Sequence, residues 1–272
     1  MQLGASPGTQ ACLNKTSPFK RILTTAVFAG VLAGLALTVV QKIQVSPILQ
    51  QAEVFEDAAR VAAASHASAM PTDAHEPQHE HSAAEAHEHE HEHEHHHAAD
   101  AWQPADGVER TLYTALANVT IAIGYGLLLC AGLCLRGDGH AVGWRAGLLW
   151  GLGAYLTFFV APSLGLPPEV PGTAAAPLVA RQIWWLTTAA MTAGGLSLLA
   201  FPRNTLLKLL GGLVLIAPHL ISAPEPLVPA SAAPAELARA FIHATAIANG
   251  VFWLLLGGLC GWFYKKFAAP SK

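Results

Sequence analysis

Six apolar segments alternate with polar segments along the chain, and each approaches the length of a membrane-spanning helix. About 20 mostly apolar residues are needed to cross the roughly 30 Å hydrocarbon core of a bilayer. The pattern therefore predicts an all-α polytopic membrane protein with about six transmembrane helices. The predicted spans are 22–40, 111–135, 146–162, 182–201, 206–222 and 240–264.

The fifth of these segments has the weakest pattern. It includes Lys208, whose long side chain must reach an interface, and Pro218 near its far end. The overall composition agrees with a membrane protein, because 53% of the 272 residues are apolar and only 12% are charged. Soluble domains carry about 25% charged residues, so this composition argues against a water-soluble enzyme.

The distribution of Lys and Arg predicts the orientation of the chain. Ten of these cations fall on the side that holds both termini, and five fall on the opposite side. Cytoplasmic loops are enriched in Lys and Arg, so both termini are expected in the cytoplasm. The expected division is a disordered cytoplasmic extension over 1–19, a first transmembrane helix over 20–41, an external periplasmic loop over 42–110, transmembrane helices two to six over 111–264, and a cytoplasmic tail over 265–272.

The external loop carries a tract that suits transition metals. Eleven of the 14 His lie within residues 66–97, and positions 87–97 have the sequence HEHEHEHEHHH. Much of the imidazole is neutral at pH 7 and able to ligate metal, while the carboxylates add oxygen ligands. Because the tract has low complexity, we expect a disordered collector of divalent metal, with a hydrophilic, pH-responsive spacer as the alternative. A short surface helix over 52–64 is expected before it. The predicted metal ligands in the tract are His75, His79, His81, His87, His89, His91, His93, His95, His96 and His97.

A threefold repeat is present in the predicted helices. The outward ends of spans one, three and five each carry a proline, a glutamate follows it six or seven residues later, and an arginine opens the next span. The chain is therefore expected to form three repeated helical hairpins with equivalent outer corners and a shared interior. The repeated positions are Pro47, Glu53 and Arg110; Pro162, Glu169 and Arg181; and Pro218, Glu225 and Arg239.

Two histidines near the outer ends of spans are further candidate metal ligands. Polar groups at membrane depth are costly there and commonly face an interior path. His219 directly follows Pro218, and His243 lies about one turn inside the last span. The pair could form an outer metal site beneath the loop, and the alternative is two interfacial histidines that bind water or a carbonyl.

Other polar positions have both a functional and a structural interpretation. Asn118 and Asn249 offer oxygen ligands, or else hydrogen bonds that join helices. Cys130 and Cys134 lie four residues apart and offer soft ligands, or else close helix packing. The three arginines of the repeat anchor helix ends, or else form gating ion pairs with Glu109 or Glu169.

Several ordered stretches carry a family resemblance. They are FKRILTTAVFAGVLAGL at the first span, ERTLYTALANV (109–119), GLLWGLGAYLTFFVAPSLGLPPEVPG (147–172), ARQIWWLTTA (180–189), APHLISAP (217–224) and PAELARAF (234–241). In these stretches the chain resembles the CbtA family, the predicted cobalt transporter proteins of bacteria. The resemblance implies an inner-membrane cobalt permease tied to cobalamin synthesis, working with a small single-span, His-containing partner (CbtB-like). It also implies five spans, whereas the charge count favours six.

These observations favour a metal permease that collects cobalt at the loop and passes it inward. The alternatives are a metal-sensing or scaffold protein without its own pore, and a nickel or zinc transporter, because imidazole sites do not encode the metal. We expect no enzyme, since the chain has no phosphate-binding loop and no H-E-x-x-H motif on a span. The expected partners are membrane lipid and the divalent metal, with no nucleic acid and no resident cofactor.

Overall fold

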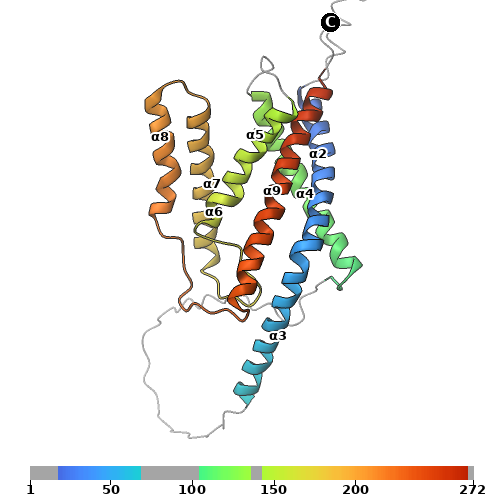
Figure 1. Ribbon diagram of the computed structural model, residues 1–272, viewed down its shortest axis with the longest axis vertical. Helices are drawn as coiled ribbons and strands as arrows, with labels where there is room; N and C mark the ends of the chain where they lie inside the picture. Colours follow the sequence, from blue (N-terminus) through green and yellow to red (C-terminus); the bar gives the residue numbers. More distant parts are fainter. Residues whose placement is uncertain (1–17, 69–103, 136–142, 269–272) are drawn as a thin grey trace, which may run out of the picture.

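The computed structural model describes residues 18–68, 104–135 and 143–268, and this part of the chain is almost entirely helical (Figure 1). The all-α prediction is confirmed, because β-pairing within these ranges amounts to one isolated bridge between Thr173 and Ser231. The elements are α2 Pro18–Val40, η1 Gln41–Val45, α3 Ser46–Ser68, α4 Val108–Leu135, α5 Trp144–Tyr155, η2 Leu156–Val160, α6 Ala161–Ser163, α7 Leu178–Ala200, α8 Thr205–Ile216, η3 Ala217–Leu220 and α9 Ala235–Lys266.

Five helical stretches of the described chain are long and apolar enough to cross a membrane. The fifth predicted span is shorter than expected, because the α-helix ends at Ile216 and Pro218 continues it only as a 3₁₀ turn. The five stretches are Pro18–His66, Val108–Leu135, Trp144–Ser163, Leu178–Ala200 and Ala235–Lys266, and the shorter apolar one is Thr205–Leu220.

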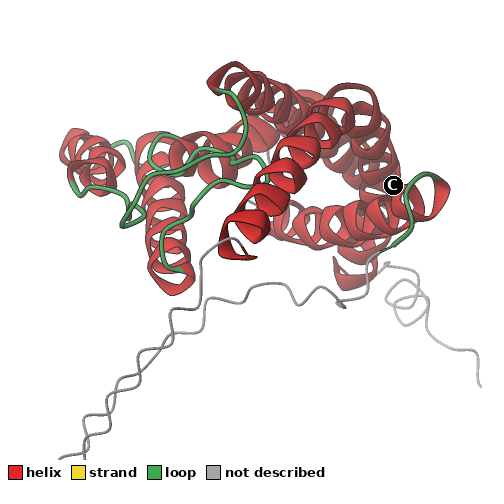
Figure 2. Cartoon of the chain, turned by 90° about the horizontal axis from the view of Figure 1, so that it is seen from below, coloured by secondary structure: helices red, strands yellow, loops and turns green. Residues whose placement is uncertain are grey.

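The short helix α8 nevertheless runs back along α7 and lies at the margin of the bundle (Figures 1 and 2). The start of α2 and the end of α9 lie together, since Arg21 Nε donates to the Tyr264 carbonyl at 2.8 Å and the guanidinium covers the Tyr264 ring. Within the described ranges, the shorter apolar helix α8 therefore adds a sixth pass along the bundle to the five longer stretches.

The first helix departs from the predicted boundary at residue 41. It continues as η1 and α3 to Ser68, so the start of the predicted loop is helical, and the surface helix expected over 52–64 is its outer part. Pro47 has no N–H and would clash with the carbonyl four residues earlier in an α-helix. The chain widens into a π-turn instead, in which the Ser46 N–H donates to the Gln41 carbonyl.

The second proline corner has the same construction as the first. The π-turn η2 comes before Pro162, and the Ala161 N–H donates to the Leu156 carbonyl. The third corner differs, because Pro218 lies in the 3₁₀ turn η3. The repeat predicted from the prolines is thus present as two π-turns and one tighter turn.

Close contact between α5 and α9 depends on glycine. A Cβ on Gly257 would lie 2.4 Å from the Gly147 carbonyl oxygen, and a Cβ on Gly147 would lie 2.1 Å from that of Gly257. Helices in lipid gain little from the hydrophobic effect, so they associate through such close packing of small residues. The core around this contact includes buried Leu256, Cys260 and Tyr264.

The segments before α7 and α9 form a cap at the end of the bundle that carries α3. The Ala232 N–H donates to the Gly172 carbonyl at 3.0 Å, which ties the two segments before α7 and α9 together. Gly172 has φ of +75°, and a Cβ there would contact Glu56 of α3. Ala52 of α3 packs in the same buried cluster as Val170. This packing holds the outer helix, and with it Glu53, in place.

Candidate functional site

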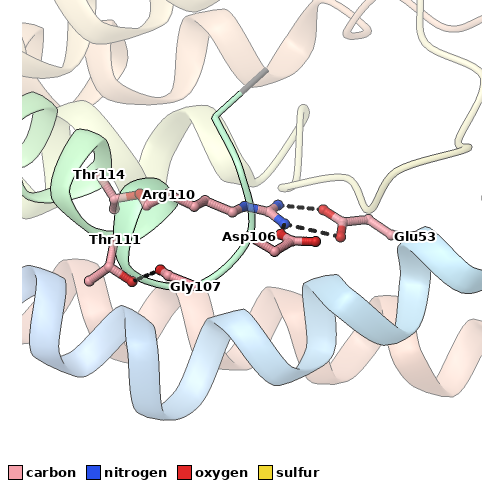
Figure 3. A network of polar contacts seen from close by, with 6 residues as sticks. All are labelled: Glu53, Asp106, Gly107, Arg110, Thr111 and Thr114. Carbon is pink, nitrogen blue, oxygen red and sulfur yellow. Dashed lines mark hydrogen bonds and ion pairs between the residues drawn. The ribbon is translucent and has the colours of Figure 1, made fainter. Parts of the chain in front are cut away.

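An arginine joins two carboxylates at the N-terminal end of α4 (Figure 3). Arg110 Nη1 donates to Glu53 Oε2 at 3.2 Å and to Asp106 Oδ1 at 3.0 Å, while Nη2 donates to Glu53 Oε1. Glu53 comes from α3, Asp106 from the turn before α4, and Arg110 from the first turn of α4. Gly107, at φ +97°, shapes that turn. Arg110 therefore neutralises two acids. Asp106 lies four residues before it in the sequence, and Glu53 lies 57 residues before it.

A polar cavity of about 240 Å³ lies beside this network, between α4 and the helix that contains η1. Its volume is enough for several water molecules. Most of its polar groups are hydroxyls and side-chain amides, and its two cations are Lys42 and Arg110. The lining residues are Thr38, Gln41, Lys42, Val45, Ser46, Leu49, Gln50, Gly107, Arg110, Thr111 and Thr114.

At the inner side of the cavity, an asparagine connects α4 with α2 and η1. Asn118 Nδ2 donates to Gln41 Oε1 at 2.7 Å and to Thr38 Oγ1 at 3.0 Å. The helix-joining interpretation of Asn118 is therefore confirmed. Asn249 behaves differently, since its Nδ2 donates to the Thr245 carbonyl within α9.

The sequence interpretation did not identify Thr38, Gln41 or Asp106. Two signals were present: Gln41 is the first strongly polar residue after the apolar run of α2, and Asp106 lies four residues before Arg110. The contacts of Thr38 and Gln41 with Asn118 could not be read from the sequence, because these residues are 80 and 77 positions from their partner. Asp106 is only four residues from Arg110, so that spacing could have indicated the pair.

The arginines of the three hairpins are used in different ways. Arg181 pairs with Glu169 at 3.4 Å, as Arg110 pairs with Glu53, so two hairpins join the acid that follows the proline to the next helix. The ion pair with Glu169 is thus present, while its gating role stays a prediction, and the partners of Arg110 are Glu53 and Asp106 instead of Glu109. In the third hairpin Arg239 pairs with Glu236 of its own helix, and both side chains are exposed.

The predicted histidine ligands fall into two groups. The ten between His75 and His97 lie outside the described residues. His219 lies against Trp184 of α7, with ring centroids 6.4 Å apart in an edge-on arrangement, and His243 is exposed on α9. Within the described ranges, no group of three or more His, Cys, Asp or Glu could hold a metal ion. The outer site formed by His219 and His243 stays a prediction.

The cysteines belong to the packed interior. Cys130 of α4 and Cys260 of α9 are fully buried in one cluster, and the Cys260 thiol lies 4.0 Å from the Gly126 carbonyl. Cys134 is half-buried at the edge of that cluster. This burial supports the packing interpretation of these residues.

One comparison with known proteins gives a match. A family model described as "Probable cobalt transporter subunit (CbtA)" matches residues 19–265. No curated protein and no solved structure matches the chain. The matched range includes the described helices except Pro18 and Lys266 at their two ends, and it includes the Arg110 network and the polar cavity.

Proposed function

Because the chain belongs to the CbtA family of probable cobalt transporter subunits, we propose that it forms the membrane path of a cobalt permease. The observation that carries this proposal is the polar cavity beside Arg110. The cavity lies between helices that are apolar enough to span a membrane, and its hydroxyl and amide groups can accompany a hydrated cation. A metal sensor or scaffold would not require such a cavity.

The orientation we propose puts both termini in the cytoplasm of a bacterium and the 69–103 segment in the periplasm. The ten-to-five cation distribution supports this choice, and the contact of Arg21 with Tyr264 agrees with two ends on one side. Asp106 follows the end of the His/Glu tract at His97 by nine positions in the sequence. Metal released from the tract would meet the Glu53–Arg110–Asp106 network before the cavity.

The proposed role of that network is an outer gate. Arg110 holds the two carboxylates in the absence of metal, and an arriving divalent cation competes with the guanidinium for them. Departure of Arg110 from Glu53 would open the cavity toward the Asn118 contacts. We also propose a small single-span partner protein, cobalt as the preferred cargo over nickel or zinc, and no catalytic activity.

Deleting residues 75–97 tests the role of the His/Glu tract. We expect weaker cobalt uptake when the metal is scarce and nearly normal uptake when it is abundant, because a collector raises the local concentration without forming the path. The measurement is radioactive cobalt uptake over a range of concentrations, into vesicles that contain this chain with and without a candidate partner. Loss of uptake at saturating cobalt would show that the tract belongs to the path. No uptake by the intact chain under either condition would favour a sensor.

His219→Ala tests the predicted outer metal site. Losing one of a few ligands costs on the order of 1–3 kcal/mol, so the half-saturating cobalt concentration should rise about ten- to a hundredfold. The control is His66→Ala, since His66 is exposed near the outer end of α3 and should leave uptake unchanged. Unchanged concentration dependence in the His219 variant would leave this residue as an interfacial neighbour of Trp184.

A further inference from the structure

A second, larger hollow lies on the same outer side of the bundle, at the beginning of α7. This groove of about 660 Å³ is formed by the segment after α6 and the first two turns of α7. It combines a charged pair with apolar and aromatic groups, and the proposed cobalt path does not use it. Its main lining residues are Pro167, Glu169, Arg181, Gln182, Trp185 and Leu186.

Arg181, at the charged end of the groove, does not use all of its hydrogen-bond donors. Arg181 Nη1 contacts Glu169 Oε2 at 3.4 Å, a long single contact, and Arg181 Nε is buried with no hydrogen-bond partner. A buried N–H without a partner is unfavourable, so an acceptor at this position would stabilise the side chain. Arg110, at the equivalent position of the first hairpin, differs because it donates three hydrogen bonds to two carboxylates.

The other end of the groove is suited to hydrocarbon. Leu186 is 61% exposed, and Ile183 on the same helix is 61% exposed. Trp185 closes the inner side, where its ring stacks on Phe158 of η2. An arginine and a tryptophan at the end of an apolar helix are typical of the level where lipid head groups meet acyl chains.

We propose that this groove binds a phospholipid with a primary amine in its head group, such as phosphatidylethanolamine. The lipid phosphate would accept hydrogen bonds from Arg181, and the ammonium would donate to Glu169. One acyl chain would lie along Trp185 and Leu186. The two charges of the head group match the two charges of the groove, and both side chains are about one-third exposed, at 32% and 35%.

Charge and hydrogen bonding exclude the other common head groups as the preferred occupant. Phosphatidylglycerol has a phosphate but no cation, so the Glu169 carboxylate would face a net negative lipid. Phosphatidylcholine has a cation that cannot donate a hydrogen bond to the carboxylate. This proposal concerns lipid binding only, so its test does not depend on whether the protein transports cobalt.

Native mass spectrometry of the intact protein, released from detergent with each of these three lipids in turn, tests the proposal. We expect the wild type to retain phosphatidylethanolamine about tenfold better than phosphatidylcholine, as one charge-assisted hydrogen bond implies. Arg181→Gln should weaken retention of all three lipids, because each carries the phosphate that Arg181 binds. Arg239→Gln is the matched control, because Arg239 opens α9 at the equivalent position but is exposed beside Glu236.

A second variant keeps the test decisive if Arg181→Gln fails to fold. Glu169→Gln retains the arginine and should make phosphatidylglycerol bind as well as phosphatidylethanolamine, because only recognition of the ammonium is lost. Equal retention of the three lipids by the wild type would overturn the proposal. Unchanged retention by a folded Arg181→Gln variant, or unchanged selectivity in a folded Glu169→Gln variant, would overturn it as well.

Discussion

Gly257→Ala is expected to lower the stability of the protein by about 2–3 kcal/mol and its Tm by about 5–10 °C. The new methyl group would lie 2.4 Å from the Gly147 carbonyl oxygen and 2.7 Å from the Gly151 Cα. Both are backbone atoms, so no side-chain rotation can relieve the overlap. Helices α5 and α9 must separate, and the packing of Gly147, Gly151 and Gly257 is lost together.

The neighbouring residue provides the control for this prediction. A Cβ on Gly258 would meet only the Leu148 side chain, at 3.3 Å and 3.8 Å, so the leucine can adjust. Gly258→Ala should therefore leave Tm unchanged or raise it slightly, because alanine favours the helix by up to about 1 kcal/mol. Thermal unfolding of the detergent-purified variants, followed by tryptophan fluorescence, measures the difference. Equal Tm values for the two variants would contradict the close α5–α9 contact.

Glu53→Gln is expected to reduce cobalt uptake about tenfold. The substitution leaves Arg110 with Asp106, which is 82% exposed, as its remaining carboxylate partner among those described. The positive charge of Arg110 is then only partly neutralised, and at the entrance of the proposed path it repels the cobalt ion. Two unit charges 4 Å apart interact by about 4 kcal/mol near a protein surface, and solvent screening at one-third exposure reduces this to about 1–2 kcal/mol.

The double variant Glu53→Gln with Arg110→Gln separates charge from structure. Removing both charges removes the repulsion, so uptake should recover to within a few-fold of the wild type. Glu236→Gln is the control, because Glu236 pairs with an exposed arginine and does not line the cavity. Initial rates of cobalt uptake, normalised to protein in the membrane, provide the comparison. If the double variant is as impaired as Glu53→Gln alone, the ion pair is structural and the proposed gate is wrong.

The three proline corners show which features of a helix end can be predicted from the local sequence and which cannot. The repeat of Pro47, Pro162 and Pro218 predicted equivalent corners, and the first two are indeed π-turns of one kind. The rules did not predict that the helix would continue for 21 residues beyond Pro47, to Ser68. Proline excludes one hydrogen bond, but whether a helix ends there depends on what packs against the following turns. Here the cap segments support α3 through Ala52.

The sequence alone determined the all-α class, the approximate position of five membrane-spanning helices and the family resemblance. Each of these depends on properties read along the chain: apolar length, charge and ordered motifs. Tertiary structure decided which polar residues meet. Glu53 and Arg110, and Gln41 and Asn118, are 57 and 77 residues apart, and their contacts follow from the packing of α2 on α4. The hydropathy pattern indicates that a helix spans the membrane. Since 3.6 residues complete a turn, polar residues can lie on any side of that helix, and the helix packed against it decides which side lines a cavity.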